Sequence, residues 1–380
     1  VSFKEYAQLC LTELVKILQV VCKNPKQPGF NHYLFECIAA LLKNAATMEM
    51  LTAFEEILFP PFMQILQEDI EQFAPYVFQL LSQLLESRPV PLPEPYLRVF
   101  PGLLAPFYWE RSGNITALVR LLQAYLRKAT TEVTSADNIQ KVLGVACEKL
   151  IPMKATDHGG FYILNSLVEC APVATFEQYL PNIWGRLLAR MQTKPTPKFF
   201  NHFVVLFGLF VCKHGPPKLV ESFEKVQPGL VWNVLEHVFL ANCTNVSGTT
   251  ERRISSIALT KLLCECPATL QDSMLGLWGK SLNTVMQLNM TEEPSEDVGD
   301  DGDVEEVVYS AAYAKLANAS LPEMDPYPEV PNSREFLARS LGTLSAQSPG
   351  RLPPMIQQML QPPAQQALQG YLAQFQVSLA

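Results

Sequence analysis

Apolar residues recur with a helical spacing throughout the chain, in segments of about 14 to 20 residues separated by short polar breaks. Residues 100–126 present the pattern most clearly, because one helical stripe ends there and another begins. Residues 110–113 form a polar break, and Asn114 is positioned to cap the helix that follows. The stripes on either side of the break consist of Leu103, Leu104, Phe107, Ile115, Leu118, Leu122 and Tyr125. This stretch therefore predicts two stacked helical units joined at a hinge.

The same helix-break-helix pattern continues on both sides of this hinge, and almost no segment alternates apolar and polar residues with a period of two. The sequence therefore predicts an all-α protein. The expected helix pairs are residues 31–45 with 51–66, 70–86 with 96–108, 115–128 with 137–151, 161–170 with 176–191, 198–213 with 219–239, and 254–266 with 274–288.

Four prolines followed by apolar residues are predicted to open the second helix of a pair, where a missing N–H costs no hydrogen bond. They are Pro61, Pro101, Pro181 and Pro228, which are separated by 40, 80 and 47 residues. A repeat of about 40 to 47 residues with two helices is typical of HEAT or armadillo arrays. Since a single pair leaves its apolar face exposed, the pairs are expected to stack into a HEAT-repeat α-solenoid.

The composition agrees with a large helical core, because 48% of the 380 residues are hydrophobic. No stretch reaches the roughly 18 apolar residues that a membrane-spanning helix needs, and no signal-peptide pattern opens the chain, so membrane insertion and secretion are not expected. The nine cysteines are scattered over apolar helical faces, which favours reduced thiols in the cytosol or nucleus. Val1 already lies inside a helical pattern, and we expect the chain to be the carboxyl half of a longer protein.

Residues 292–306 interrupt the helical pattern with nine carboxylates and no basic residue. Three helix-breaking residues lie among them, so a mobile loop is expected. The nine carboxylates account for almost all of the net charge of -8. The predicted organisation has three parts. A HEAT array covers residues 1–290, and capping helices cover residues 332–380. Residues 291–331 between them contain the acidic insertion, a short helix at 310–317 and a proline-rich linker.

The middle of the chain has the opposite charge bias, with 14 basic and 8 acidic residues between Arg111 and Lys225. Five of the bases flank apolar stripes, namely Arg120, Arg127, Arg186, Arg190 and Lys194. The four arginines among them are candidates for partner binding. The alternative role is structural, because long basic side chains also cover apolar surface on solvated helix faces. Nucleic acid is not expected as a partner, since neither a basic stripe nor a stacking-aromatic motif accompanies the excess.

No catalytic constellation emerges, and neither a Walker loop nor a G-x-S-x-G motif is present. Asp157 and His158 form the nearest acid-base candidate, although a helix-capping role for Asp157 explains the same residues. Cys264 and Cys266 lack further ligands at zinc spacing, so no metal, cofactor or catalytic residue is expected. Ser255 in ERRISS matches a basophilic kinase motif but lies in a helical pattern. The four tryptophans sit among leucines at helical spacing and are expected in the core.

Several long stretches resemble the carboxyl-terminal half of the CAS family, also called exportin-2, of the importin-beta superfamily. The similarity runs over essentially all 380 residues, except that the acidic insertion matches in charge character alone. The stretches that carry it are FNHYLFECIAALLK at 30–43, FPGLLAPFYWERSGNITALVRLLQAYL at 100–126, DHGGFYILNSLVE at 157–169, IALTKLLCECP at 257–267 and LQGYLAQ at 368–374.

The resemblance implies a nuclear transport receptor that binds importin-alpha cooperatively with Ran bound to GTP and returns importin-alpha from the nucleus to the cytoplasm. It implies a shuttling monomer without enzymatic activity or a cofactor of its own, since the GTP belongs to Ran. A static HEAT scaffold for other protein complexes is the alternative, and an enzyme is a more distant one. Partner binding that rises with Ran-GTP distinguishes the receptor from the scaffold.

Two candidate contact surfaces follow from these patterns. The polar break WERSGN favours a partner contact through Glu110, Arg111 and Asn114, and the alternative is an intramolecular ion pair of Arg111. The acidic insertion is expected to touch a basic surface of the chain itself or of Ran, and the alternative is a solvated spacer. Its candidate contact residues are Glu296, Asp297, Asp300, Asp301 and Asp303.

Overall fold

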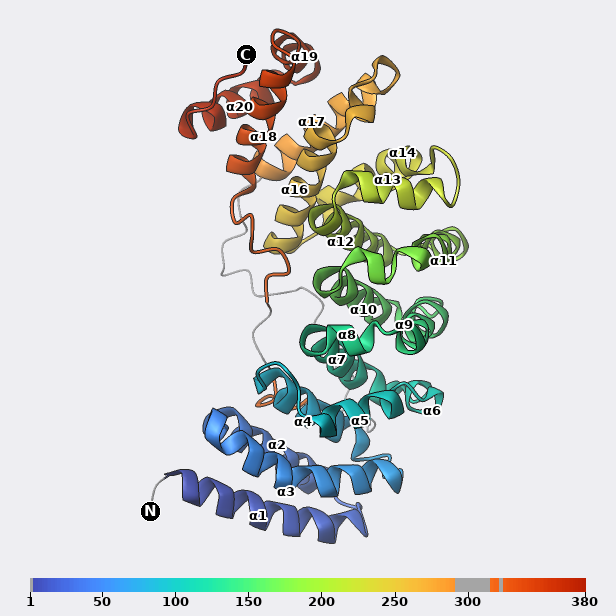
Figure 1. Ribbon diagram of the computed structural model, residues 1–380, viewed down its shortest axis with the longest axis vertical. Helices are drawn as coiled ribbons and strands as arrows, with labels where there is room; N and C mark the ends of the chain where they lie inside the picture. Colours follow the sequence, from blue (N-terminus) through green and yellow to red (C-terminus); the bar gives the residue numbers. More distant parts are fainter. Residues whose placement is uncertain (1–2, 291–314, 321–323) are drawn as a thin grey trace. The chain divides into compact units, whose positions relative to one another are not determined.

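A computed structural model describes residues 3–290, 315–320 and 324–380 (Figure 1). Those residues form helices joined by turns and short irregular segments, without any β-strand, which confirms the all-α prediction. The chain forms two compact units, Val1–Ala171 with Val304–Glu323 and Pro172–Asp303 with Met324–Ala380. The division into an array, an insertion and a cap stays a prediction.

The first unit contains a run of helices whose apolar faces pack in sequence. They are α1 (Phe3–Cys22), α2 (Pro28–Ala45), α3 (Met48–Gln67), α4 (Ala74–Ser87), α5 (Glu94–Leu103), α6 (Pro106–Glu110), α7 (Ser112–Lys128), α8 (Thr130–Val133), α9 (Ala136–Leu143), the π-helical segment η1 (Gly144–Leu150) and α10 (Asp157–Cys170). Helices α2, α4, α7 and α10 pack one against the next. This row carries the inter-repeat contacts described below.

The second unit continues the same construction. Its elements are η2 (Val173–Thr175), η3 (Glu177–Tyr179), α11 (Leu180–Thr193), α12 (Pro197–His214), α13 (Pro216–Glu224), α14 (Leu230–Val234), η4 (Leu235–Phe239), α15 (Leu240–Asn242), η5 (Cys243–Asn245), α16 (Thr249–Glu265), η6 (Pro267–Leu270), η7 (Asp272–Met274), α17 (Leu275–Met290), α18 (Ser333–Gln347), α19 (Leu352–Met359) and α20 (Pro362–Gln374). Helix α16 packs between α12 and α18, and α20 packs on α17 and α18.

Side-chain contacts between consecutive repeats join residues about one repeat apart. The hydroxyl of Tyr108 donates to Leu66 O at 3.2 Å, and the two residues are 42 positions apart. In the second unit, Lys218 Nζ donates to Glu177 Oε2 at 3.0 Å across 41 positions. These separations agree with the two-helix repeat predicted from the sequence.

The predicted common position of the four prolines is wrong. Pro181 lies in the first turn of α11, as expected. Pro61 instead lies inside α3, Pro101 lies near the end of α5, and Pro228 lies in the turn before α14. Buried apolar residues flank Pro61 on both sides within α3, so tertiary packing of the helix outweighs the backbone hydrogen bond that proline removes.

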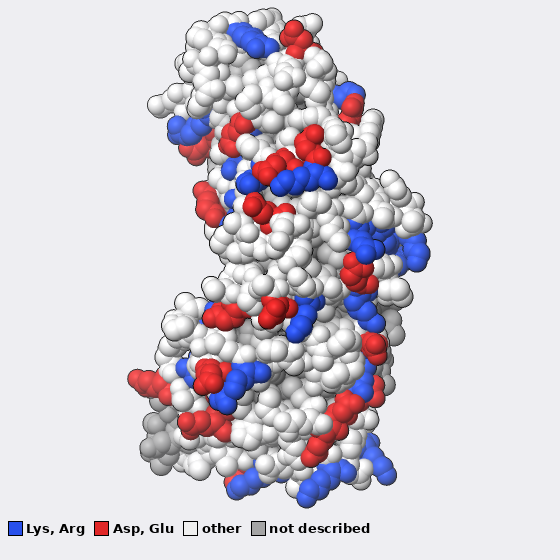
Figure 2. All heavy atoms as spheres, turned by 45° about the vertical axis from the view of Figure 1, so that its right-hand side comes forward, with Lys and Arg blue, Asp and Glu red and all other residues white. Residues whose placement is uncertain are grey.

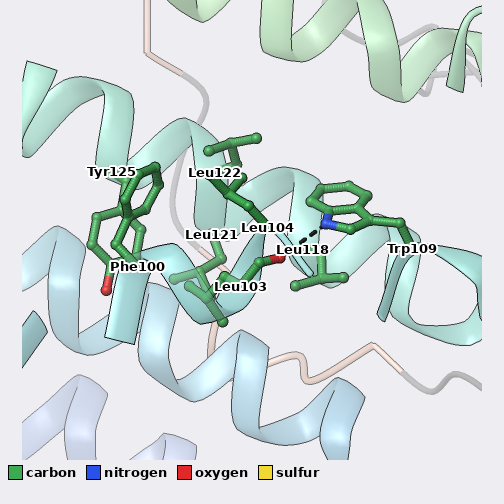
Figure 3. A pocket seen from close by; sticks show the side chains of 8 residues that line it. All are labelled: Phe100, Leu103, Leu104, Trp109, Leu118, Leu121, Leu122 and Tyr125. Atoms are coloured by element: carbon green, nitrogen blue, oxygen red, sulfur yellow. Dashed lines mark hydrogen bonds between the residues drawn. The ribbon is translucent and has the colours of Figure 1, made fainter. Parts of the chain in front are cut away.

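The hinge predicted around residues 100–126 is a closed apolar core. Figure 3 shows side chains of α5 and α7 turned toward one another, with Trp109 beside them. They enclose about 10 Å³ of free space, which is too small for a ligand. The indole N–H of Trp109 donates to Leu103 O at 2.9 Å and is thereby satisfied. Phe107 does not join the predicted stripe, because its side chain is largely exposed.

The prediction that Asn114 caps a helix is wrong. Helix α6 ends at Glu110 and α7 begins at Ser112, so Asn114 lies inside α7. Its side chain is buried, and Nδ2 donates to Tyr108 O at 3.1 Å. Asn114 therefore satisfies a carbonyl group of α6 from within α7. The turn between these helices is shorter than the run of polar residues, which is why the sequence placed the helix start too late.

Helix α12 lies in the core of the second unit and packs against Trp184 of α11. The Trp184 ring centre lies 5.6 Å from that of Phe210 and 6.3 Å from that of Phe203. The predicted core position of the tryptophans is confirmed for three of them, and Trp232 is partly exposed. Among the described residues, no single helix is long and apolar enough to span a membrane, whereas α12 and α13, bent by 119°, meet the criteria as a pair.

Gly160 of α10 lies so close to its neighbours that a larger residue does not fit. Helix α10 begins at Asp157, earlier than predicted, and a Cβ atom on Gly160 would lie 2.8 Å from Ile151 Cγ1 and 2.9 Å from Ala146 O. We expect Gly160→Ala to lower the free energy of unfolding by about 1 to 3 kcal/mol, measured by chemical denaturation. In α11, Gly185 has nothing within 4 Å of such an atom. Gly185→Ala is therefore the matched control and should be neutral or stabilising; equal losses in both variants would contradict the close approach.

Candidate partner-binding surfaces

Residues 315–320 lie across α2, α4 and α7, and we name them the docked segment. The segment is remote in sequence from its hydrogen-bond partners, with separations of 199 to 282 residues. Leu316 and Ala319 are fully buried in the first unit. The helix predicted at 310–317 is absent from 315–317, and the rest of that prediction lies outside the described residues. This segment is therefore held by long-range contacts and not by a helix of its own.

Polar side chains of α2 and α4 bind the main chain of the docked segment. Leu316 N donates to Gln79 Oε1 at 2.8 Å. The carboxylate of Glu36 accepts from Ala317 N at 2.5 Å and from Asn318 N at 3.2 Å. These three donors are backbone N–H groups, which every extended peptide offers. Glu36 Oε2 also accepts from the side-chain amide Nδ2 of Asn318 at 2.9 Å.

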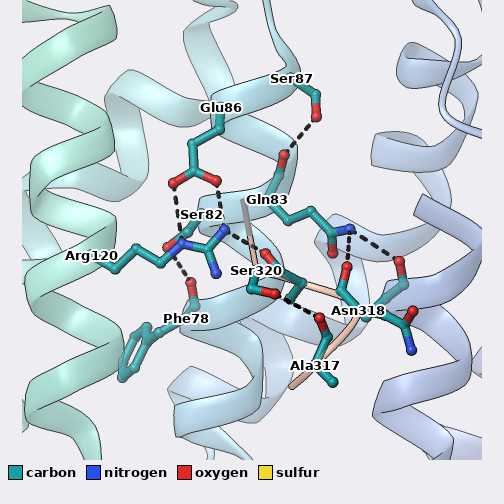
Figure 4. A network of polar contacts seen from close by, with 11 residues as sticks. Phe78, Ser82, Gln83, Glu86, Ser87, Arg120, Ala317, Asn318 and Ser320 are labelled. Carbon is teal, nitrogen blue, oxygen red and sulfur yellow. Dashed lines mark hydrogen bonds and ion pairs between the residues drawn. The ribbon is translucent and has the colours of Figure 1, made fainter. Parts of the chain in front are cut away.

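Arg120 of α7 joins the docked segment to α4 (Figure 4). Its Nε and Nη2 donate to the carboxylate of Glu86 at 3.1 and 2.6 Å. The same Nη2 donates to Ala319 O at 2.6 Å, while Gln83 Nε2 donates to Asn318 O at 3.3 Å. Arg120, which the sequence nominated as a partner contact, thus binds a segment of its own chain.

A second stretch, residues 324–331, is bound by α12 and α16 of the second unit. The guanidinium group of Arg253 donates to Tyr327 O at 2.9 Å and to Asp325 Oδ1 at 2.5 Å. Lys213 Nζ lies 5.1 Å from the centre of the Tyr327 ring, a cation–π distance. The proline-rich linker predicted here is therefore fixed on helices over its described part.

The kinase motif around Ser255 is not available on the surface of the second unit. Ser255 is fully buried in α16, and its Oγ donates to Glu251 O at 2.9 Å. The arginine two positions before it, Arg253, is engaged by residues 325–330. The packing of α16 thus explains why Arg253 and Ser255 occur at these positions.

The predicted surface at residues 110–114 is held by contacts inside the first unit. Arg111 Nη2 donates to Asp69 Oδ2 at 2.6 Å, and Nη1 donates to the other carboxylate oxygen. The hydrogen bond from Arg111 lowers the pKa of Asp69. Glu110 is exposed, and Asn114 is buried. The ion pair favours a structural role for Arg111, and a partner contact through this surface stays a prediction.

The remaining basic candidates have different surroundings. Arg127 Nη2 lies 3.7 Å from Glu169 Oε2, across the contact between α7 and α10. Arg190 is buried, with its guanidinium carbon 4.8 Å from the centre of the Phe199 ring. Arg186 is exposed on α11. Figure 2 shows basic and acidic side chains mostly beside one another on the face in view, without one continuous basic stripe.

Five of the candidate contact residues are acidic and belong to the insertion. Glu296, Asp297, Asp300, Asp301 and Asp303 lie outside the described residues. The structure instead identifies binding side chains that the sequence did not single out, namely Glu36, Gln79, Gln83 and Arg253. The sequence carries only a weak signal for two of them, because Gln79 and Gln83 lie four positions apart in the apolar helix α4, and the structure shows that both are buried. Buried polar side chains need hydrogen-bond partners, so this spacing marks a binding face.

Residues 2–371 match the family model described as CAS/CSE protein, C-terminus. The chain belongs to the CAS/CSE family. It is similar to Exportin-2 of Pagrus major, with 41% identity over 384 residues, and to Exportin-2 of Homo sapiens, with 40% identity over 384 residues. Each comparison covers 98% of this CAS/CSE chain and 39% of the relative, so the chain spans well under half the length of these relatives.

A solved structure described as the exportin Cse1 in its cargo-free, cytoplasmic state has a fold similar to this CAS/CSE chain. The TM-score is 0.83 at 25% sequence identity, and the match covers 97% of this chain and 38% of the solved one. Together with the repeat contacts described above, this similarity confirms the HEAT-repeat solenoid predicted from the sequence.

Proposed function

We propose that the chain is the carboxyl-terminal part of a nuclear export receptor, which binds importin-alpha cooperatively with Ran-GTP and returns importin-alpha to the cytoplasm. The observation that carries this proposal is the similarity to Exportin-2 of Homo sapiens over 98% of the chain. The receptor shuttles between nucleus and cytoplasm as a monomer. GTP stays on Ran, so the chain itself needs no cofactor and catalyses no reaction.

The repeat construction suits a receptor with two partners. Each repeat contacts its neighbours through small interfaces, such as the pair of Arg111 with Asp69, which are 42 positions apart. An array of this kind bends by small adjustments at many interfaces. Two partners that favour the same bent state raise each other's affinity, because each shifts the population of states toward the other's preferred one.

A pull-down with both nucleotide forms of Ran tests the proposal. The chain is immobilised and incubated with importin-alpha together with Ran-GTP or Ran-GDP. The export receptor retains more importin-alpha with Ran-GTP than with Ran-GDP. Equal retention with both forms would favour a static scaffold, and no retention with either form would remove the proposal for this part of the protein.

The acidic insertion provides a kinetic prediction within this proposal. Replacing the nine carboxylates between residues 292 and 306 by amides should slow association with Ran-GTP and flatten its salt dependence, because contacts between exposed charges are screened over about 8 Å at physiological salt. The thermal melting of the helices should stay unchanged. Stopped-flow association rates across a salt series measure this, and rates identical to those of the unaltered chain would make the insertion a spacer.

Arg111→Glu tests the surface at residues 110–114. The variant is expected to change the free energy of unfolding by less than about 1 kcal/mol, because the pair with Asp69 is partly exposed. With the fold intact, weaker binding of importin-alpha or Ran-GTP would assign Arg111 to a partner surface. Unchanged binding of both would leave Arg111 with its structural role alone.

A further inference from the structure

The docked segment leaves a buried acceptor of its binding face unused. Gln83 Nε2 donates to Ala39 O at 3.0 Å and to Asn318 O at 3.3 Å, and these two acceptors fix the orientation of the amide. Gln83 Oε1 is buried and has no hydrogen-bond partner among the residues that the structure describes. A buried acceptor without a donor has lost its hydrogen bonds to water without replacement, which destabilises this arrangement. Residues 315–320 are therefore an incomplete ligand for the face that holds them.

Most of the contacts are to the main chain of the docked segment, and one is to a side chain, since Asn318 Nδ2 donates to Glu36 Oε2 at 2.9 Å. Five backbone groups between Leu316 and Ala319 are held by side chains of α2, α4 and α7. The side chains that hold them are Glu36, Gln79, Gln83 and Arg120. Because backbone groups are common to all peptides, the face selects its ligand through side chains. The two buried positions take a branched apolar side chain and, three residues later, a small one, and Glu36 accepts from the side-chain amide between them.

The side chains of the face are also held by contacts that do not involve the docked segment. Helix α4 packs directly on both α2 and α7. Glu86 orients Arg120 through two hydrogen bonds, and Gln83 is anchored to Ala39 O of α2. Donors that are already oriented lower the entropic cost of binding a peptide. These contacts orient Gln83 and Arg120 for a ligand.

We propose that the face formed by Glu36, Gln79, Gln83 and Arg120 binds an extended peptide segment of a partner protein, and that the docked segment occupies it as an intramolecular competitor. The partner segment carries a branched apolar residue, a small residue three positions later, and an additional N–H or O–H donor that reaches Gln83 Oε1. Covalent attachment gives the docked segment an effective concentration on the order of millimolar, so the partner binds as the docked segment leaves.

The test uses the whole chain with residues 315–320 replaced by three Gly-Ser pairs, which we name the open variant. The probe is a fluorescein-labelled hexapeptide with the sequence Lys-Leu-Ala-Asn-Ala-Ser, and fluorescence anisotropy measures its binding. The open variant is expected to bind the probe saturably. The intact chain should bind it at least about tenfold more weakly, because the attached copy competes. Equal affinity for both chains, or no binding to an open variant that melts like the intact chain, would overturn the proposal.

Glu36→Ala in the open variant should weaken probe binding at least about tenfold, since the carboxylate accepts from two backbone N–H groups of the segment. Glu13→Ala is the matched control, because Glu13 is a largely exposed glutamate on α1 that pairs with Lys16. The control should bind the probe like the open variant itself. If Glu36→Ala binds the probe as tightly as this control, the peptide is not on the assigned face and the proposal fails.

Hydrogen exchange on the intact chain gives a second measurement that does not require the open variant to fold. Excess unlabelled peptide is expected to accelerate deuterium uptake at the amides of Leu316, Ala317 and Asn318, because the peptide displaces them from Gln79 and Glu36. Unchanged uptake at these amides with the peptide at several millimolar would contradict competition for this face.

Discussion

Trp184→Ala is expected to lower the free energy of unfolding by about 3 to 5 kcal/mol. The indole is 1% exposed, and its Nε1 donates to Ser222 Oγ at 2.9 Å. Its ring is stacked on Phe223 at a centroid distance of 4.8 Å and meets Phe210 edge-on. Alanine would leave a large cavity among these rings, because the surrounding helices α11, α12 and α13 can close it only in part. Guanidinium unfolding followed by circular dichroism measures the loss.

Trp232→Ala is the matched control for this prediction. Trp232 of α14 belongs to the same unit but is partly exposed, so less apolar area returns to water when its side chain is removed. The control should therefore lose clearly less stability than Trp184→Ala. Similar losses in the two variants would mean that the Trp184 site collapses without a cavity and would contradict its assignment to the core.

Glu55→Ala is expected to destabilise the first unit by about 3 kcal/mol, because it leaves a guanidinium group that is only 11% exposed without its counter-charge. Glu55 accepts from Arg88 Nε at 2.6 Å and from Tyr96 OH at 2.6 Å, and Arg88 Nη2 donates to its second oxygen. Burial and the hydrogen bond to Glu55 raise the pKa of Tyr96, which keeps its hydroxyl protonated as a donor. Thermal and chemical denaturation measure the effect.

Two further variants separate a buried pair from an ordinary surface pair. Glu94→Ala removes a carboxylate that is 75% exposed and lies 3.5 Å from Arg98, so the change should stay within about 0.5 kcal/mol. Replacing Glu55 by leucine and Arg88 by methionine together should cost less than Glu55→Ala, since no unpaired charge remains. A double variant that is less stable than the single one would show that the pair itself, and not the unpaired charge, carries the stability.

Helical periodicity was sufficient to predict the architecture. Each repeat packs on its neighbours through an apolar face, and such a face appears in the sequence as apolar residues at helical spacing. The positions at which individual helices begin were predicted less well from the sequence. Pro61 resembles a helix start when only its local sequence is considered, yet the apolar face of α3 extends on both sides of it. Asn114 likewise has the composition of a cap, although α7 begins two positions earlier. In both cases tertiary packing outweighed a local preference.

The docked segment was beyond prediction from patterns, because its partners are 199 to 282 positions away and its contacts are made by backbone groups. Arg120 was nominated for its charge, and the structure gives it a ligand from the same chain. Gln79 and Gln83 were overlooked, since glutamine is common on helix surfaces and its burial in α4 appears only in the structure. The family resemblance, in contrast, was visible in the sequence because it rests on several similar stretches distributed along the chain.

The coupling between importin-alpha and Ran-GTP is the most direct test of the proposed receptor function. Isothermal titration calorimetry gives the dissociation constant of importin-alpha for the chain with and without saturating Ran-GTP, and that of Ran-GTP with and without importin-alpha. The account predicts that each partner tightens the other by the same factor, on the order of 5- to 150-fold, as thermodynamic linkage requires. Dissociation constants of importin-alpha that are equal in the presence and absence of Ran-GTP would contradict it.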